Sequence, residues 1–437
     1  MNVAVVGGGI TGLTAAYRAA QAGHRVTLFE AGDRLGGKLI TSEFDGRPVD
    51  EGPDAFLARV PHAVDLCREL GLADELVAPA AGQAFVWTRG RLRPLPEGLV
   101  LGVPTDLPAL ARSGILSWAG MARAGLDLVL PPSRLGDDPS VAAVVTARFG
   151  REASERLVEP LLGGIHAGRA DGLSLASTAP QLAASQHRSM LLGLRGTRPS
   201  LDGPVFLSLQ GGMGRLAACL AELIEQAGVD VHLGHPLAAI PDATPPDADM
   251  VVLTTPARAT AALLDPVSPD AAAELRRIPH ASVVLVTLAY PAHAFPAPLT
   301  GSGFLVPRVD GKLMTACSFG SNKWPHWSRP GQVVLRVSAG RAGDERAMAL
   351  SDDDVVAALH TELGQALGVM SPPTARRVSR WVDGFPQYAP GHAARVARIE
   401  AALARDAAHV RLAGAALHGV GIPACIASAS RLFHTSR

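Results

Sequence analysis

An α/β fold with a parallel sheet is the fold class that this sequence predicts, and three observations predict it. A short apolar strand over Asn2–Val6 runs through a glycine cluster into an alanine-rich helix over Leu13–Ala22. A second buried strand over Arg25–Phe29 follows and ends at Glu30. Strand, turn and helix patterns of the same kind recur at residues 206–254. Strands that alternate with helices are typical of a parallel sheet covered by helices.

The glycines of the first turn have separable roles. The turn consists of Gly7, Gly8, Gly9, Ile10, Thr11 and Gly12. Gly7 permits the tight turn, Gly9 lets the backbone approach a diphosphate, and Gly12 lets the helix pack closely on the strand. Glu30 stands where a carboxylate accepts hydrogen bonds from both ribose hydroxyls and repels a 2′-phosphate. The pattern predicts a Rossmann-like dinucleotide site and leaves NAD and FAD open.

The residues that follow Glu30 favour FAD. They read Ala31, Gly32, Asp33, Arg34, Leu35, Gly36, Gly37 and Lys38, which resembles the second glycine motif of the flavin-dependent amine oxidase and porphyrinogen oxidase superfamily. Adjacent glycines bring the backbone close to a diphosphate and ribityl chain, and Arg34 or Lys38 supplies positive charge. The resemblance implies FAD as the cofactor, with residues 30–31 and 36–38 in contact with it.

Five further segments extend the resemblance along the chain to porphyrinogen oxidases of the bacterial water-soluble type. They are Gly52–Leu57, Glu159–Gly168, Leu209–Met213, Phe385–His392 and Gly419–Ile426. The chain departs from the family pattern at Leu417-His418 and at Ala429. The resemblance implies further flavin contacts from Gly52, Pro53, Asp54, Ala55, Trp381, Gly421, Ile422 and Pro423.

The same resemblance implies a function, the oxidation of coproporphyrinogen III in haem biosynthesis. Six electrons and six protons leave the substrate, the flavin accepts hydride, and molecular oxygen is reduced to hydrogen peroxide. The sequence shows no catalytic triad or metal-spaced cluster, so no catalytic side chain and no metal are predicted. Three alternatives remain: oxidation of protoporphyrinogen IX, the activity of another FAD-dependent amine oxidase or desaturase, and a non-catalytic flavoprotein.

Porphyrinogen propionates require guanidinium partners when their carboxylates are buried. Arg59 follows the loop expected beside the flavin, and Arg169 follows the glycine-rich turn at 163–168. Both are therefore candidate substrate-binding residues, with ordinary solvated arginines as the alternative. His166 is expected to be a packed histidine rather than a base, because no partner for it is visible in the sequence.

Three pieces, at 1–75, 205–275 and 395–437, are expected to assemble the FAD-binding domain. Between them lie a mostly helical insertion at 76–204, facing substrate or membrane, and an α+β substrate-binding domain at 276–394. The latter carries a strand at 282–290 and a helix at 353–367. Gly211–Gly214 is interpreted as the turn that starts a helix, with a second phosphate loop as the alternative.

Composition limits the possible partners. The chain has 437 residues, of which 48% are hydrophobic, and 40 basic residues balance 40 acidic ones. A large core is therefore expected, and nucleic acid is not an expected partner. Four widely separated cysteines and the lack of a leader pattern predict reduced thiols and a cytoplasmic protein. Residues 110–130 carry an apolar surface that packs within its own domain, contacts the inner face of a membrane or forms a homodimer.

Overall fold

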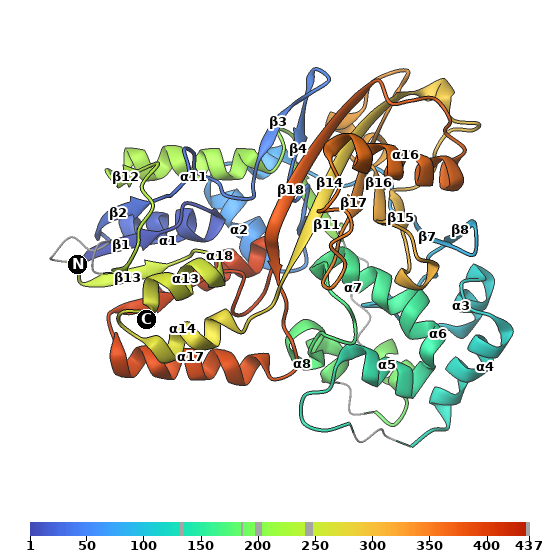
Figure 1. The fold of residues 1–437 in the computed structure, drawn as a ribbon, viewed down its shortest axis with the longest axis horizontal. Helices are drawn as coiled ribbons and strands as arrows, with labels where there is room; N and C mark the ends of the chain where they lie inside the picture. The colour runs from blue at the N-terminus through green and yellow to red at the C-terminus, as the bar shows by residue number, and fades with distance from the viewer. Residues whose placement is uncertain (132–134, 185–186, 197–202, 241–247, 434–437) are drawn as a thin grey trace. The chain divides into compact units, whose positions relative to one another are not determined.

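The chain forms two compact units. The computed structural model describes residues 1–131, 135–184, 187–196, 203–240 and 248–433. Unit 1 comprises Met1–Ala78, Gly203–Pro279 and Ala393–Arg437. Unit 2 comprises Pro79–Asp202 and His280–His392. The N-terminal, middle and C-terminal thirds of the chain therefore all contribute to unit 1 (Figure 1).

Unit 1 is built on a five-stranded sheet with the strand order β12-β2-β1-β13-β19, in which every neighbouring pair is parallel. The strands are β1 (Asn2–Val6), β2 (Arg25–Phe29), β12 (Asp230–His232), β13 (Met250–Leu253) and β19 (Val410–Leu412). The two N-terminal strands have the predicted bounds. The α/β fold with a Rossmann-like sheet is confirmed.

Successive side chains of β1 point to opposite faces of the sheet, and both faces are buried. Val3 and Val5 join one apolar core, whereas Ala4 and Val6 join another. The helices of the first core are α1 (Ile10–Gln21), α2 (Pro61–Glu69), α11 (Gly214–Gln226) and α18 (Ile422–Ser430). The helices of the second core are α13 (Ala257–Leu264), α14 (Pro269–Arg276) and α17 (His392–Asp406). Figure 1 shows the two sets on opposite faces of the sheet.

Unit 1 also contains two smaller sheets of short strands. They are the hairpin β3 (Thr41–Phe44) and β4 (Arg47–Asp50), and the sheet of β5 (Phe56–Leu57), β11 (Phe206–Leu209) and β6 (Leu76–Val77), with the turn η1 (Ala73–Glu75). The amide of Met213 donates to Asp50 Oδ1 at 2.8 Å, and that of Gly214 donates to Thr41 Oγ1 at 2.8 Å. Since Thr41 and Asp50 already satisfy these amides, Gly211–Gly214 is a helix-starting turn, as predicted.

Unit 2 contains a seven-stranded sheet with the order β18-β14-β17-β16-β15-β7-β8. The strands are β7 (Ala84–Thr88), β8 (Arg91–Pro94), β14 (His280–Pro291), β15 (Gly303–Leu305), β16 (Met314–Phe319), β17 (Gln332–Ala339) and β18 (Ala375–Pro386). Helix α16 (Asp352–Leu367) packs its apolar side chains into the core of this sheet. The sequence divided 76–204 from 276–394, but β7 pairs with β15, and both segments therefore belong to one unit.

The remainder of unit 2 is mostly helical. Its elements are β9 (Leu99–Val100), β10 (Val103–Pro104), α3 (Leu107–Ser113), α4 (Trp118–Gly125), η2 (Leu126–Leu128), α5 (Val141–Phe149), α6 (Arg151–Ala153), η3 (Ser154–Val158), α7 (Glu159–His166), α8 (Leu175–Thr178), α9 (Pro180–Ala183) and α10 (Met190–Arg195). Short turns and one helical turn punctuate the sheet region: η4 (Ala292–Ala294), η5 (Arg308–Asp310), α15 (Gly320–Lys323) and η6 (Pro325–Trp327).

Residues 110–130 form two short helices and a turn. Gly114, at φ 62°, ends α3, and the Ser117 hydroxyl accepts the Gly120 amide to start α4. Trp118 is 86% exposed and Val129 is 63% exposed, whereas Asp127 is fully buried. An apolar surface is thus present, but part of this segment packs into its own unit.

Within the described ranges, no helix is long and apolar enough to cross a membrane. The same residues include no group of three or more histidine, cysteine or acidic side chains suited to a metal ion. Cys67, Cys219, Cys317 and Cys425 are free and buried. Burial raises the pKa of Cys67 to about 12, so this thiol stays protonated at neutral pH.

Candidate functional site

The two glycine motifs of unit 1 lie directly against each other. The Gly36 amide donates to the Gly8 carbonyl at 2.8 Å, and Gly9 and Gly36 form a parallel bridge. A Cβ atom on Gly37 would stand 3.0 Å from Gly9 Cα, which is closer than such atoms normally approach. The backbones can meet here because neither residue has a side chain. The predicted loops therefore form one continuous backbone surface.

Close packing inside the first turn depends on Gly12. A Cβ there would lie 1.8 Å from the Gly7 carbonyl oxygen, so only glycine lets α1 begin so near β1. Gly7 itself has φ 103°. The Thr254 hydroxyl lies 2.9 Å from the carbonyl oxygens of Val6 and Gly7 and holds the turn from the end of β13. Sequence reasoning missed Thr254, although a hydroxyl just after a strand adjacent to β1 was a usable signal.

The N-terminus of α1 is suited to bind an anion. Its N-cap is Gly9, no side chain caps it, and no acidic residue lies in its first turn. A Cβ on Gly9 would meet only Gly37 Cα, at 4.0 Å. The first amides of the helix and its positive dipole end therefore face space that a phosphate group can take. The residues present fit the diphosphate of FAD.

Glu30 lies at the end of β2, beside this turn. Its Oε2 accepts the Gly8 amide at 2.6 Å, and its Oε1 accepts the Gly32 amide at 2.8 Å. The next residue, Ala31, is exposed. The carboxylate is thus held at the glycine turn, where the ribose contact is predicted, and each of its oxygens can accept a further hydrogen bond besides that of the backbone amide.

The closing motif at the C-terminus joins the same region. Helix α18 packs against α1 and begins after Gly421, with Ile422 and Pro423 in its first turn. Burial raises the pKa of Cys425 and lowers the pKa of Lys38. Thr11 and the Lys38 ammonium are both close enough to the Cys425 thiol to lower its pKa, against the larger effect of burial. The closing motif, which lies hundreds of residues after the two glycine motifs in the sequence, therefore meets them around the start of α1.

The remaining predicted flavin contacts lie in both units. Gly52, Pro53, Asp54 and Ala55 form the loop between β4 and β5 of unit 1, in which the Asp54 side chain is buried. Trp381 lies in β18 of unit 2, is half-buried, and pairs with Val283 of β14. The flavin contacts of these residues stay predictions.

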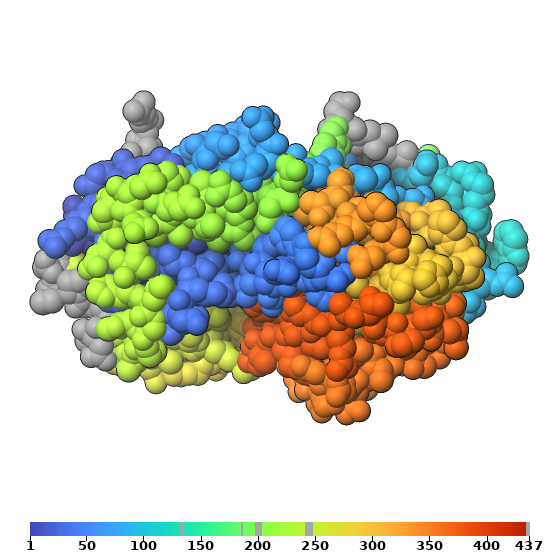
Figure 2. All heavy atoms as spheres, turned by 90° about the horizontal axis from the view of Figure 1, so that it is seen from above, coloured from blue at the N-terminus to red at the C-terminus, as the bar shows by residue number. Residues whose placement is uncertain are grey.

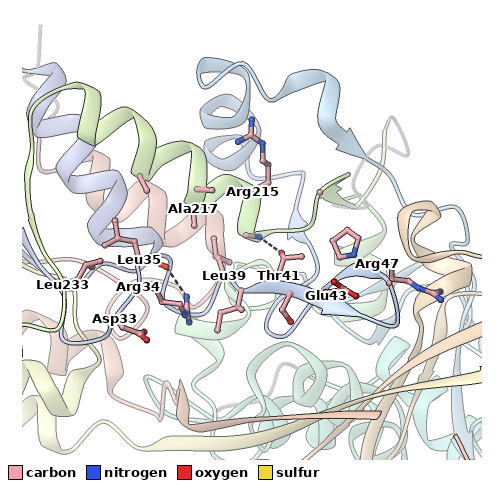
Figure 3. Close-up of a pocket in the computed structure, with 18 residues that line it drawn as sticks. Asp33, Arg34, Leu35, Leu39, Thr41, Glu43, Arg47, Arg215, Ala217 and Leu233 are labelled. Carbon is pink, nitrogen blue, oxygen red and sulfur yellow. Dashed lines mark hydrogen bonds between the residues drawn. The ribbon is translucent and has the colours of Figure 1, made fainter. Parts of the chain in front are cut away.

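A pocket of about 1020 Å³ opens elsewhere in unit 1, between residues 33–48 and helix α11. Figure 2 shows the two segments side by side, and Figure 3 shows the residues between them. Arg34 does not reach out of its own segment, because its guanidinium donates to the carbonyl oxygens of Leu35 and Gly37. None of the predicted flavin-contacting residues lines this pocket. Arg34 therefore stabilises the second glycine turn from the pocket side.

The predicted substrate-binding arginines differ in their surroundings. Arg59 of unit 1 is exposed, and among the described residues no hydrogen bond or ion pair to its side chain occurs. Arg169 of unit 2 makes a bidentate pair with Asp171, at 3.0 and 2.6 Å. Hydrogen bonding to Asp171 raises the pKa of Arg169. A substrate carboxylate must compete with Asp171 for this guanidinium.

His166 ends α7 and is held by its backbone, since its carbonyl accepts Gln387 Nε2 at 2.8 Å. Burial lowers the pKa of the imidazole to about 4. A position at a helix C-terminus favours the charged form by only about 0.3–1 kcal/mol, so desolvation prevails. His166 is neutral at physiological pH, as expected for a packed histidine.

This depressed pKa predicts a pH-dependent stability. Between pH 6.5 and about 4 the unfolded chain binds a proton that the folded chain does not. Stability should therefore fall as pH drops through this window, by about 1 kcal/mol at pH 5 after allowing for solvent screening. Urea unfolding of the wild type and of His166→Asn at pH 7 and pH 5 measures this difference. Equal losses in both proteins would contradict the assignment.

The chain is similar over nearly its whole length to known flavin-dependent oxidases. The family model described as flavin containing amine oxidoreductase matches residues 10–432. The chain is 36% identical to the coproporphyrinogen III oxidase of Bacillus subtilis (strain 168), over 97% of this chain and 95% of that protein. It is 38% identical to the coproporphyrinogen III oxidase of Mycobacterium tuberculosis (strain ATCC 25618 / H37Rv), over 98% and 95%. A crystal structure from Exiguobacterium sp. 255-15, provisionally described as a protoporphyrinogen oxidase, superposes with a TM-score of 0.88 at 34% identity, over 99% of this chain and 97% of that one.

Proposed function

Because this chain belongs to the flavin containing amine oxidoreductase family, we propose that it oxidises coproporphyrinogen III to coproporphyrin III with molecular oxygen as acceptor. The observation that carries this proposal is its full-length likeness to two relatives named coproporphyrinogen III oxidase. The likeness covers unit 2 as well as unit 1, whereas proteins that share only a nucleotide-binding domain would match unit 1 alone. The reaction belongs to haem biosynthesis.

FAD, when bound, supplies the acceptance of hydride and its passage to oxygen. In unit 1, the first amides of α1 and the glycine backbones at 9 and 37 would hold the diphosphate, and Glu30 would hold the ribose. The chain then has to bind and orient the porphyrinogen. Six electrons leave the substrate in three two-electron steps, so three oxygen molecules yield three hydrogen peroxide molecules for each porphyrin.

Porphyrin fluorescence and peroxide together test this proposal. The purified protein, loaded with FAD, is supplied in air with coproporphyrinogen III or protoporphyrinogen IX. We expect faster fluorescence growth with coproporphyrinogen III, together with about three peroxide molecules for each porphyrin formed. A higher kcat/KM for protoporphyrinogen IX would favour the alternative substrate. No porphyrin from either compound would refute porphyrinogen oxidation and leave another flavin oxidase or a non-catalytic flavoprotein.

Arg59 and Arg169 are proposed to contact substrate carboxylates. Both side chains are accessible, and Arg169 already has a carboxylate partner, so each contact should contribute modestly. Replacing either residue with methionine is expected to raise KM about threefold with little change in kcat. Steady-state kinetics with coproporphyrinogen III measure this, and Arg151→Met, an exposed arginine paired with Glu155, serves as the control. An unchanged KM in both variants would remove these residues from the substrate site.

We further propose a cytoplasmic protein in which the apolar surface at 110–130 contacts the inner face of a membrane or a second copy of the chain. Trp118, Leu126, Leu128 and Val129 expose large apolar side chains there. Vesicle sedimentation and light scattering distinguish the two partners. The variant Trp118→Glu should abolish the association that the wild type shows.

A further inference from the structure

A buried arginine in unit 2 has no carboxylate partner among the residues that the structure describes. Arg341 follows β17 and is only 4% exposed. Its Nε has no hydrogen-bond partner, and no ion pair among the described residues includes its guanidinium. A charged group that is taken out of water without an acceptor is strongly unfavourable. An acceptor supplied by a ligand would offset this penalty.

The backbone around Arg341 is fixed. Gly340 has φ 93°, and a Cβ on it would stand 2.7 Å from the Ser282 carbonyl oxygen, so this position requires glycine. The Asp344 amide donates to the Arg341 carbonyl at 2.9 Å, and the Ala342 amide donates to the Ala167 carbonyl at 2.8 Å. The turn at 340–344 is therefore anchored to the end of α7. Arg341 cannot leave its buried position by a simple shift of a loose loop.

The neighbouring arginines each have their own carboxylate. The pairs are Arg308 with Glu159 at 2.9 Å, Arg346 with Asp344 at 2.7 Å, and Arg169 with Asp171 at 2.6 Å. Arg169 belongs to the same locality, because its Nη1 lies 3.5 Å from where a Cβ of Gly343 would stand. Each of the three available carboxylates thus has a closer cation. Arg341 is the most buried of the four arginines, and it is the one that these three carboxylates leave without an ion pair.

The surrounding charges do not remove this imbalance. Glu159 and Asp344 attract the Arg341 guanidinium from a distance, whereas Arg308 and Arg346 repel it. The Glu362 carboxylate, which lies toward Arg346, accepts the amides of Leu313 and Met314. Burial lowers the pKa of Arg341, but an arginine side chain keeps its proton in proteins. Nearby His166 is neutral, so it adds no charge.

We infer that Arg341 is a carboxylate-binding residue and that it takes one propionate of the porphyrinogen. The guanidinium presents paired N–H donors in a plane, which match the two oxygens of a carboxylate. The porphyrinogen as ligand rests on the proposed function; the preference for a carboxylate rests on the unpaired cation alone. Arg341 positions the substrate and takes no part in the redox chemistry.

Two porphyrins that differ only in their carboxylates test this inference without turnover. Coproporphyrin III and its tetramethyl ester are titrated into the FAD-loaded protein, and binding is followed by quenching of tryptophan fluorescence. The wild type should bind the acid more tightly than the ester. Arg341→Met should lose about tenfold in affinity for the acid and little for the ester. Arg341→Lys should recover part of the loss, because lysine restores the positive charge but not the planar pair of N–H donors.

Arg151→Met is the control, since Arg151 belongs to the same unit, is exposed and pairs with Glu155, which is not one of the carboxylates near Arg341. It should bind both porphyrins like the wild type. Thermal unfolding adds a second readout: Arg341→Met should unfold at the same or a higher temperature, because it removes an unpaired buried charge. A lower unfolding temperature with equal loss of acid and ester binding would make Arg341 a structural residue and overturn the inference.

The outcomes for the two proposals are separable. If the wild type discriminates acid from ester through Arg341 but produces no porphyrin from coproporphyrinogen III, the proposed reaction fails and the carboxylate site stands. If it produces porphyrin while Arg341→Met keeps both KM and the acid-to-ester preference, the reaction stands and the inference fails. Failure of the wild type to bind coproporphyrin III would also overturn the inference.

Discussion

Replacing Gly9 with valine is expected to remove FAD while leaving the apoprotein folded. A Cβ at this position meets only Gly37 Cα, at 4.0 Å, and the backbone of Gly9 is extended, at φ −73° and ψ −178°, which suits a β-branched residue. The added methyl groups then occupy space in front of the first amides of α1. The affinity for FAD should fall at least about a hundredfold, which corresponds to about 2.7 kcal/mol. Flavin absorbance of the purified protein and FAD titration of the apoprotein measure this loss.

Gly12→Ala is the informative contrast to Gly9→Val. Its Cβ would fall 1.8 Å from the Gly7 carbonyl oxygen and 2.8 Å from Thr254 Oγ1, so the helix must move away from the strand. We expect loss of FAD together with about 1–3 kcal/mol of stability, as for other overpacked sites. Gly9→Val, compared with wild-type apoprotein, should show no such loss. Retention of FAD by Gly9→Val would refute the predicted diphosphate site, and destabilisation of its apoprotein would show that Gly9 serves packing.

Replacing Arg148 with leucine is expected to destabilise unit 2 more than any surface substitution. Arg148 Nε donates to Asp127 Oδ1 at 2.5 Å, and the other nitrogens donate to the carbonyl oxygens of Asp127, Pro131 and Arg188. Asp127 Oδ2 also accepts from the Ser189 hydroxyl and the Leu191 amide. Loss of the arginine leaves a buried carboxylate without its counter-ion, which costs about 3–5 kcal/mol. Urea unfolding followed by tryptophan fluorescence measures the loss.

A double replacement separates the ion pair from simple packing. In Arg148→Leu with Asp127→Leu neither buried charge remains, so the combined loss should be smaller than the sum of the two single losses. Arg151→Leu, an exposed arginine a few residues away, should change stability by less than about 0.5 kcal/mol. Additive losses in the double variant would show that Arg148 and Asp127 act independently.

Residues 110–130 show why the local sequence pattern does not predict which side chains are buried. In the sequence, Asp127 interrupts an apolar stretch, and nothing in that stretch indicates whether its side chain is buried. In the structure it is fully buried, because Arg148, Ser189 and Leu191 satisfy its carboxylate from two other elements. Burial of a charge depends on partners distant in sequence, and no periodicity of the local segment encodes them.

The sequence by itself determined the dinucleotide-binding β1-turn-α1-β2 unit, its FAD-type second glycine motif, and the family. These follow from short-range physics: β1 and β2 alternate their side chains over a few residues, and each glycine removes a steric restriction at one position. Only the tertiary structure decided that Gly9 meets Gly37, that Thr254 holds Gly7, and that Cys425 reaches Thr11. It alone showed that Arg341 is buried with no carboxylate partner in the described part of the chain, because whether a charge is paired depends on which distant carboxylates other arginines have already taken.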